Sequence, residues 1–160
     1  MANTNSIPGR LLAVTINGNK IQCEQDATLT FTANISEETG CKATETDGAG
    51  GIPYVKRTVD SKDVSLSFSN KAFVSALKAN TDVWNNVDLI NLFIEGDLVV
   101  DYVFGTTQTV DYDYSHIITY SGTGFLSSVT LNAPVEGNAS TDIEIVGNGK
   151  PTQTITAVTP

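Results

Sequence analysis

The sequence has little of the chemistry from which metal sites and catalytic centres are built. Its 160 residues include two cysteines, Cys23 and Cys41, and one histidine, His116. Two thiols are too few for a disulfide framework, and in a chain without a leader we expect them to stay reduced. These three side chains leave a zinc ion short of a fourth ligand, and no nucleophile motif accompanies the histidine. We therefore predict no metal, no cofactor and no enzyme.

Positive charge is also scarce. Nine Lys and Arg residues stand against eighteen Asp and Glu residues, which gives a formal net charge of −9 and a pI near 4.3. A chain of this charge repels phosphate groups. The composition therefore argues against a protein that grips nucleic acid through a basic surface.

Long apolar runs are missing as well. No stretch approaches the roughly 18 apolar residues of a membrane span. Residues 1–10 lack the basic and apolar regions of a signal peptide. We expect a soluble protein that is made in the cytoplasm and does not insert into a membrane.

The sequence is rich in glycine, threonine, asparagine and serine. Apolar residues make up 40% of the chain and charged residues 17%, which favours an all-β domain with long loops. The length suits a single domain over residues 1–160. Residues 1–9 are expected to form an N-terminal arm, and residues 150–160 a C-terminal tail or a short edge strand.

Alternating apolar and polar residues predict the strands. The clearest prediction is a hairpin of residues 126–131 and 141–146, ended by Gly147 and Gly149. Further strands are predicted over residues 11–16, 20–33, 64–68, 98–104 and 110–120, with an Asn-Gly turn at residues 17–19. The stretch 98–104 has too little alternation for an exposed strand, so we expect it to be central and covered on both faces.

One helix is predicted over residues 81–96. Its apolar face would consist of residues spaced i, i+4, i+7 and i+11: Val83, Val87, Ile90 and Ile94. Four residues could cap its start, Thr81, Asp82, Asn85 or Asn86, and Gly96 can take the left-handed conformation after its end. The sequence therefore predicts a β-sandwich or barrel with one flanking α-helix.

Residues 34–61 lose all periodicity. The segment Asp47–Gly51 lacks the Lys-Ser/Thr of a phosphate-binding loop and opens no helix. Loops longer than about 15 residues are unusual in compact domains, so this one is either disordered or bound to something else. Ile52, Tyr54 and Val55 supply apolar side chains for such a contact.

Three motifs resemble a known family. Gly122-Thr-Gly124, Val129-Thr-Leu-Asn-Ala-Pro134 and Ile143-Glu-Ile-Val-Gly-Asn-Gly149 are similar to the closing hairpin of the tailed-bacteriophage major tail tube proteins. The order of the other elements also resembles that family: a strand pair, a long polar loop, a strand, a helix and then strands to the end. The resemblance implies a structural subunit with the β-sandwich or barrel of the tail tube type.

Tail tube proteins assemble into stacked hexameric rings that form the channel for DNA delivery. By resemblance, the partners would be further copies of this chain, a tape-measure protein and tail terminator or baseplate proteins, and DNA would pass without specific binding. The protein would belong to the virion tail, assembled in the bacterial host cytoplasm. Six copies that lend four strands each would make a backbone circle about 37 Å across, wide enough for duplex DNA.

The resemblance also implies candidate contact residues. The long loop would reach the next ring through Thr44, Asp47, Gly50, Ile52, Tyr54 and Val55. Asp111 and Asp113, which alternate with tyrosines in the strand over 110–120, are candidates for the lumen wall. They do not supply the six to eight oxygens that calcium needs.

Two other functions stay open at this point. One is the tube protein of a related contractile injection device or tailocin, which would share the fold and differ in cargo. The other is a secreted adhesive or sugar-binding β-sandwich, which would be a monomer made with a signal peptide.

Overall fold

The structure is a computed structural model, and it describes residues 12–21, 24–37, 57–71, 83–106 and 116–157. The elements in chain order are β1 (Leu12–Ile16), β2 (Asn19–Ile21), β3 (Glu24–Glu37), β4 (Arg57–Lys71), β5 (Val83–Trp84), α1 (Asn86–Glu95), β6 (Val99–Thr106), β7 (His116–Asn132), β8 (Ser140–Gly147) and β9 (Thr152–Ala157). The prediction of an all-β fold with one helix is confirmed. Contacts group the chain into two units, residues 1–30 with 64–160, and residues 31–63.

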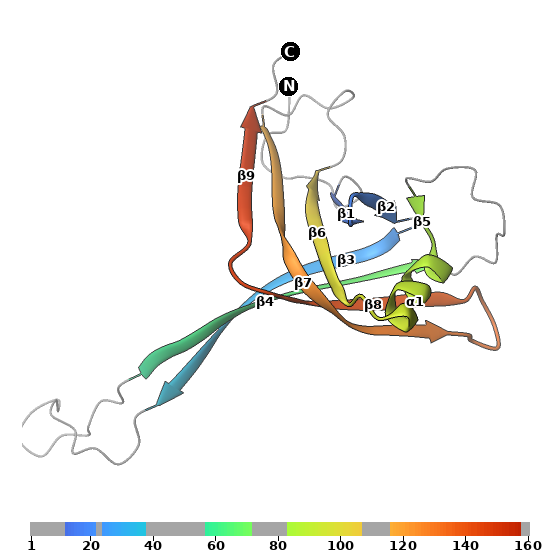
Figure 1. The fold of residues 1–160 in the computed structure, drawn as a ribbon, viewed down its shortest axis with the longest axis horizontal. Coiled ribbons are helices and arrows are strands. Elements are labelled where there is room, and N and C mark those ends of the chain that lie inside the picture. Colours follow the sequence, from blue (N-terminus) through green and yellow to red (C-terminus); the bar gives the residue numbers. More distant parts are fainter. Residues whose placement is uncertain (1–11, 22–23, 38–56, 72–82, 107–115, 158–160) are drawn as a thin grey trace, which may run out of the picture. The chain divides into compact units, whose positions relative to one another are not determined.

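The long strand β7 organises the sheet of the first unit (Figure 1). The strand order is β3-β4-β8-β7-β6-β1-β2-β5, and β9 also pairs with β7. On one edge β7 pairs with β6 over residues 119–125. On its other edge β8 pairs with residues 124–132 and β9 with residues 116–121. The predicted hairpin of β7 and β8 is confirmed as an adjacent antiparallel pair.

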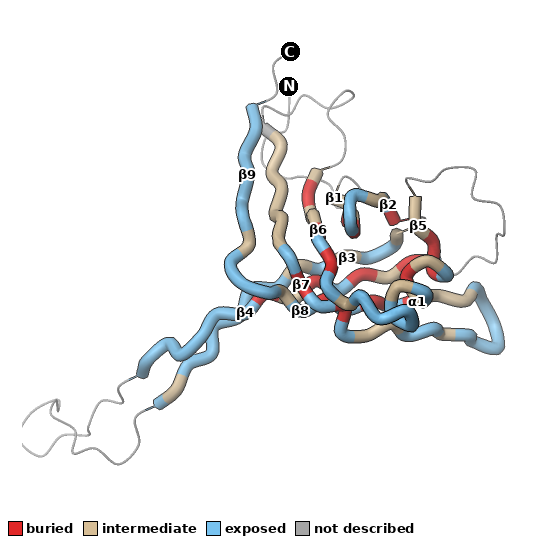
Figure 2. The backbone as a smooth tube through the Cα atoms, in the orientation of Figure 1, coloured by how far each residue is buried: buried red, intermediate tan, exposed pale blue. Residues whose placement is uncertain are grey.

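The buried residues of this sheet form one hydrophobic core, and their positions along the backbone are red in Figure 2. It consists of Val14, Ile16, Ile21, Val64, Leu66, Phe68, Leu89, Val100, Tyr102, Leu126, Ile143 and Ile145, all 8% exposed or less. A bulge between Leu126 and Ser128 adds one residue to β7. Because of that extra residue, both Leu126 and Val129 contact the core although they stand three positions apart.

The glycine motif of β7 makes room for core side chains. Gly122 lies directly opposite Tyr102, and a Cβ there would come within 2.8 Å of the tyrosine Oη. A Cβ on Gly124 would lie 2.6 Å from Cγ2 of Ile145. Burial raises the pKa of the Tyr102 phenol above its usual value of 10. The sequence motif is therefore a packing motif that places a neutral tyrosine ring under the sheet.

The helix is shorter than the prediction over 81–96 and buries a different face. Asn85 caps α1 by accepting hydrogen bonds from the backbone N–H groups of Val87 (2.9 Å) and Asp88 (3.1 Å), and Gly96 ends it at φ 96°. The expected apolar face is wrong, because Val87 and Ile94 are 43% and 72% exposed while Leu89 is fully buried. Residues two positions apart point to opposite sides of a helix, and this helix carries apolar residues on both sides.

Several strands extend beyond their predicted bounds. β3 continues to Glu37 and β4 begins at Arg57, so both ends of the loop predicted over 34–61 are strand. The strand predicted over 64–68 is also longer, because polar residues extend β4. The strand predicted over 98–104 does lie inside the sheet, as β6. It is not covered on both faces, however, since Val99 and Asp101 are exposed.

The first hairpin turn follows its prediction. Asn17 and Gly18 have φ values of 49° and 78°, which is the pattern of a two-residue turn with left-handed residues. The N–H of Asn17 donates to the carbonyl of Asp101 (2.8 Å). Counting back along β1, alternate N–H groups therefore point toward β6, and the N–H of Val14 points to the opposite edge of β1.

A side chain occupies that edge of β1. The Val14 N–H donates to Oε2 of Glu24 over 2.9 Å, although β2 pairs only with Thr15 and Ile16. Burial raises the pKa of the Glu24 carboxyl above its usual 4.5, and the hydrogen bond from Val14 lowers it by less. The raised pKa means that the ionised carboxylate destabilises the fold.

Replacing Glu24 by Gln should therefore raise the melting temperature at pH 7, because the amide oxygen still accepts from Val14 and carries no charge. The protonated carboxyl favours the folded state below its ordinary pKa, and this contribution is lost as pH rises through the raised value. The advantage of Glu24→Gln should shrink to nothing as the pH falls below 4.5. Thermal unfolding between pH 4 and 8 measures it, with the exposed Glu144→Gln as control. Equal melting temperatures at pH 7 would contradict the burial argument.

Candidate assembly interface

Strands β1, β6, β7 and β9 form a four-stranded antiparallel part of the sheet with two open edges. No other described strand pairs with the second edge of β9. At the opposite end, β2 covers only Thr15 and Ile16, which leaves Leu12–Val14 without a described strand beside it. Open strand edges present unpaired N–H and C=O groups, and they are templates for pairing with another chain.

The two open edges run in opposite directions. Each of the three pairings from β1 to β9 is antiparallel, so β9 runs opposite to β1. When copies of this unit are related by rotation about an axis along the strands, β9 of one copy meets β1 of the next in the antiparallel sense. An even number of strands per copy thus allows the alternation to continue around a closed ring.

One face of these four strands packs on the core, and the other is rich in hydroxyl groups. Cross-strand register places the following residues on the hydroxyl-rich face: Ala13, Thr15, Asp101, Val103, Gly105, Ile117, Thr119, Ser121, Thr123, Thr152, Thr154 and Thr156. Asp101 is the charged member of this set. Most of these residues carry small polar groups, Val103 and Ile117 are apolar, and none is a cation. Val99 and Phe125 continue the same face beyond Asp101 and Thr123.

The second unit is a two-stranded arm built from the end of β3 and the start of β4. Its strands are joined on one face by polar side chains. Ser36 Oγ donates to Asp60 Oδ1 (2.9 Å), and Asn34 Nδ2 donates to Ser61 Oγ (2.7 Å) and to Asp63. Because such contacts replace apolar alternation, the sequence patterns did not identify this part of the arm as strand.

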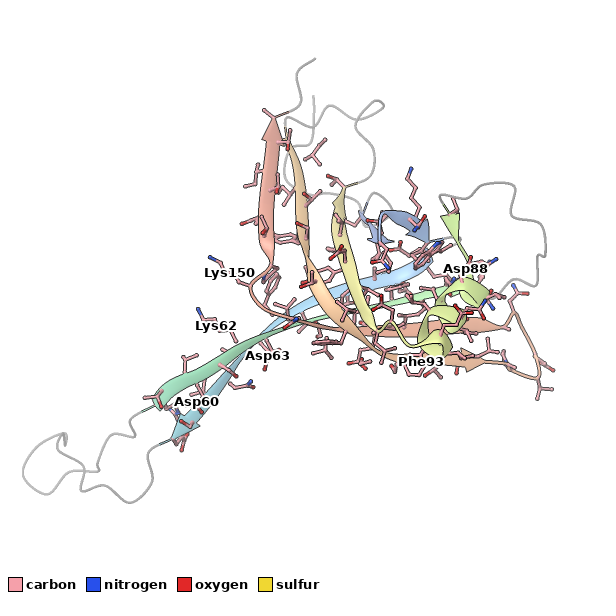
Figure 3. The ribbon with its side chains drawn as sticks, viewed as in Figure 1. Asp60, Lys62, Asp63, Asp88, Phe93 and Lys150 are labelled. Carbon is pink, nitrogen blue, oxygen red and sulfur yellow. The ribbon has the colours of Figure 1, made fainter. Side chains whose placement is uncertain are left out.

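The other face of the arm is partly apolar. Ile35 lies between Asn34 and Ser36, and Val59 lies between two residues of the polar face, so both point away from it. Each is 57% exposed. Arg57 belongs to the same face and pairs with Glu37 (2.7 Å). Lys62 neighbours Asp63 in the strand and points away from it (Figure 3), so Lys62 lies on the side of the arm opposite the polar contacts.

The candidate residues from the sequence lie outside the described residues. This holds for the loop residues Thr44, Asp47, Gly50, Ile52, Tyr54 and Val55, for the lumen candidates Asp111 and Asp113, and for Cys23 and Cys41. The short edge strand, one of the two alternatives expected for residues 150–160, is present as β9. The open edge of β1, the hydroxyl-rich face and Asp101 were missed, because alternation predicts strands and does not show which strand lies at an edge.

Two chemical features are absent from the described part of the chain. No group of three His, Cys, Asp or Glu side chains is arranged to hold a metal ion. No helix there is long and apolar enough to cross a membrane.

Several solved structures share this fold. Two come from a gene transfer agent (GTA): the native virion, with a TM-score of 0.63 at 15% identity, and the tail of the empty particle with C6 symmetry, with a TM-score of 0.60 at 16% identity. Both matches cover 93% of this chain and 99% of the other.

Two further protein chains match over most of their own length. The SPP1 tail tube has a TM-score of 0.60 at 11% identity, covering 96% of this chain and 80% of the other. The tube-terminating cap of the anti-feeding prophage (AFP) has a TM-score of 0.54 at 14% identity, covering 99% and 95%. No protein-family model and no curated protein matches the sequence. The chain has the fold of the phage tail tube proteins.

Proposed function

We propose that this chain is the subunit of a phage tail tube, which self-assembles into stacked hexameric rings around a channel for DNA delivery. The observation that carries the proposal is the four-stranded antiparallel sheet with open edges at β1 and β9. The fold it shares with the SPP1 tail tube supports the same role. The role is structural rather than catalytic.

Ring closure follows from the edges. Pairing of β9 with β1 of the next copy would satisfy both sets of open backbone groups, and the Glu24 carboxylate would leave the Val14 N–H as the new strand arrives. Six copies give 24 strands, four from each, and a circle about 37 Å across before strand tilt widens it. The C6 symmetry of the matched GTA tail supports the choice of six.

The hydroxyl-rich face suits the lumen. It offers hydrogen-bonding groups to passing DNA without the cations that would bind phosphate and release counterions. Six copies at −9 each give a ring of −54 formal charges. We assign Asp101 to this lumen wall and keep Asp111 and Asp113, which precede β7 in the sequence, as further candidates.

The other partners follow from the same role. The loop between β3 and β4, with Thr44, Asp47, Gly50, Ile52, Tyr54 and Val55, would contact the next ring. A tape-measure protein and tail terminator or baseplate proteins would complete the tail. The protein would be assembled in the cytoplasm of the bacterial host and remain in the virion tail.

A second candidate is the tube of a contractile injection device or tailocin. The match to the AFP tube-terminating cap, which covers 99% of this chain, favours it. The same open edges would close the same ring, and only the cargo would differ. Packaged DNA in particles that contain this subunit distinguishes the two.

The purified chain should form hexameric rings and tubes near physiological pH and salt, because the open edges of β1 and β9 are complementary. Native mass spectrometry and negative-stain microscopy measure this. A variant that ends at Lys150 lacks β9 and should stay unassembled, whereas one that ends at Ala157 should assemble like the full chain. A full-length protein that stays monomeric at high concentration would rule out the proposal.

Replacing Asp111 and Asp113 by Lys should leave assembly intact and slow DNA delivery. The ring's formal charge would change from −54 to −30, and lumen cations would hold phosphates in a salt-dependent way. Delivery rates of variant virions at several salt concentrations test this. The control is Glu95→Lys with Asp97→Lys at the end of α1, which makes the same charge change away from the lumen. Equal slowing by both variants would count against the lumen assignment.

A further inference from the structure

An exposed apolar row crosses three strands of the first unit. Val99, Phe125 and Val146 are direct neighbours in the register of β6, β7 and β8. They are 50%, 46% and 43% exposed. Side chains directly opposite each other in an antiparallel sheet lie about 5 Å apart, so the three form one continuous strip. We call this strip the apolar row.

The opposite face of the same strands is the hydrophobic core, with Val100 and Ile145 among its members. Strands that are apolar on both faces are normally covered on both. The missing alternation in residues 98–104 therefore has a physical meaning, because the second cover is absent from the described part of this chain. Exposed apolar patches with polar rims mark interaction sites.

The rim of the apolar row is acidic. Glu144 lies two residues from Val146 along β8, on the same face, and is exposed. A two-residue step along a strand is about 6.6 Å. Lys71 of the neighbouring strand β4 lies on the same face of the sheet. It pairs with Ser140, at the end of β8 away from Val146.

The apolar face of the arm has the matching arrangement. Ile35 and Val59 are its exposed apolar residues, and Arg57 and Lys62 carry positive charge on either side of Val59. Arg57 pairs with Glu37 on the arm itself, so Lys62 is the cation that we match to Glu144.

We infer that the apolar face of the arm docks across the apolar row of another copy of this chain. The inference rests on the proposed stacking of copies and names the surface that receives the arm. Apolar packing between Val59 and the row supplies the buried centre of the contact, and Lys62 against the acidic rim fixes its register.

Photo-cross-linking identifies the receiving surface directly. Val59 is replaced by p-benzoylphenylalanine in the full chain, tubes are assembled from mixed light and ¹⁵N-labelled copies, and the cross-linked peptides are mapped. The docking predicts peptides from β6, β7 or β8 that join two different copies. Cross-links to α1, to the same copy, or to no peptide in intact tubes would overturn it. Absence of tubes in the unmodified chain would instead contradict the proposed function, and the docking with it.

Charge reversal gives a second test that does not depend on the probe. Lys62→Glu should shorten the tubes about tenfold, because each of the six arms of a ring would then present a carboxylate to an acidic rim. Adding Glu144→Lys should restore their length, while rings form in every variant. The control Lys150→Glu makes the same charge change outside the arm and should leave tube length unchanged. Failure of Glu144→Lys to rescue Lys62→Glu would overturn the docking.

Discussion

Pairing of the backbone along β7 is the constraint on which the rest of the structure depends. A strand of 17 residues must satisfy two edges, and it does so with β6 on one side and with β8 and then β9 on the other. This division leaves β9 at an edge and gives β6 and β1 the opposite side. In the four-stranded part of the sheet, β1-β6-β7-β9, the unpaired edge groups belong to β9 and to residues 12–14 of β1. The proposed ring follows from these two edges.

The glycine motif and the bulge show how the sequence serves that pairing. Gly122 and Gly124 remove side chains where Tyr102 and Ile145 need the volume. The bulge after Leu126 brings both Leu126 and Val129 into contact with the core, although they are three residues apart. These features lie in the middle of β7, where the strand passes from β9 to β8 as its neighbour on one edge.

Most of the fold in the first unit could be predicted from the sequence, because its strands alternate and its first turn has the Asn-Gly signal. The helix face could not, since Leu89 and Val87 are both apolar and only tertiary packing decides between them. The strand part of the arm could not either, because Ser36 and Asp60 hold it with hydrogen bonds instead of apolar contacts. The open edges depend on pairing between distant strands, which no local pattern contains. The missing alternation near Val99 was a local signal of the exposed apolar row.

Hydrogen exchange at β9 tests the central claim most directly, that the open edges of this sheet join one copy to the next. The amides of Thr152–Ala157 are compared in dispersed subunits and in assembled rings. The account predicts that every second amide of β9, those facing away from β7, exchanges rapidly in the subunit and slowly in the ring. Rings that form while these amides keep their rapid exchange would contradict the account.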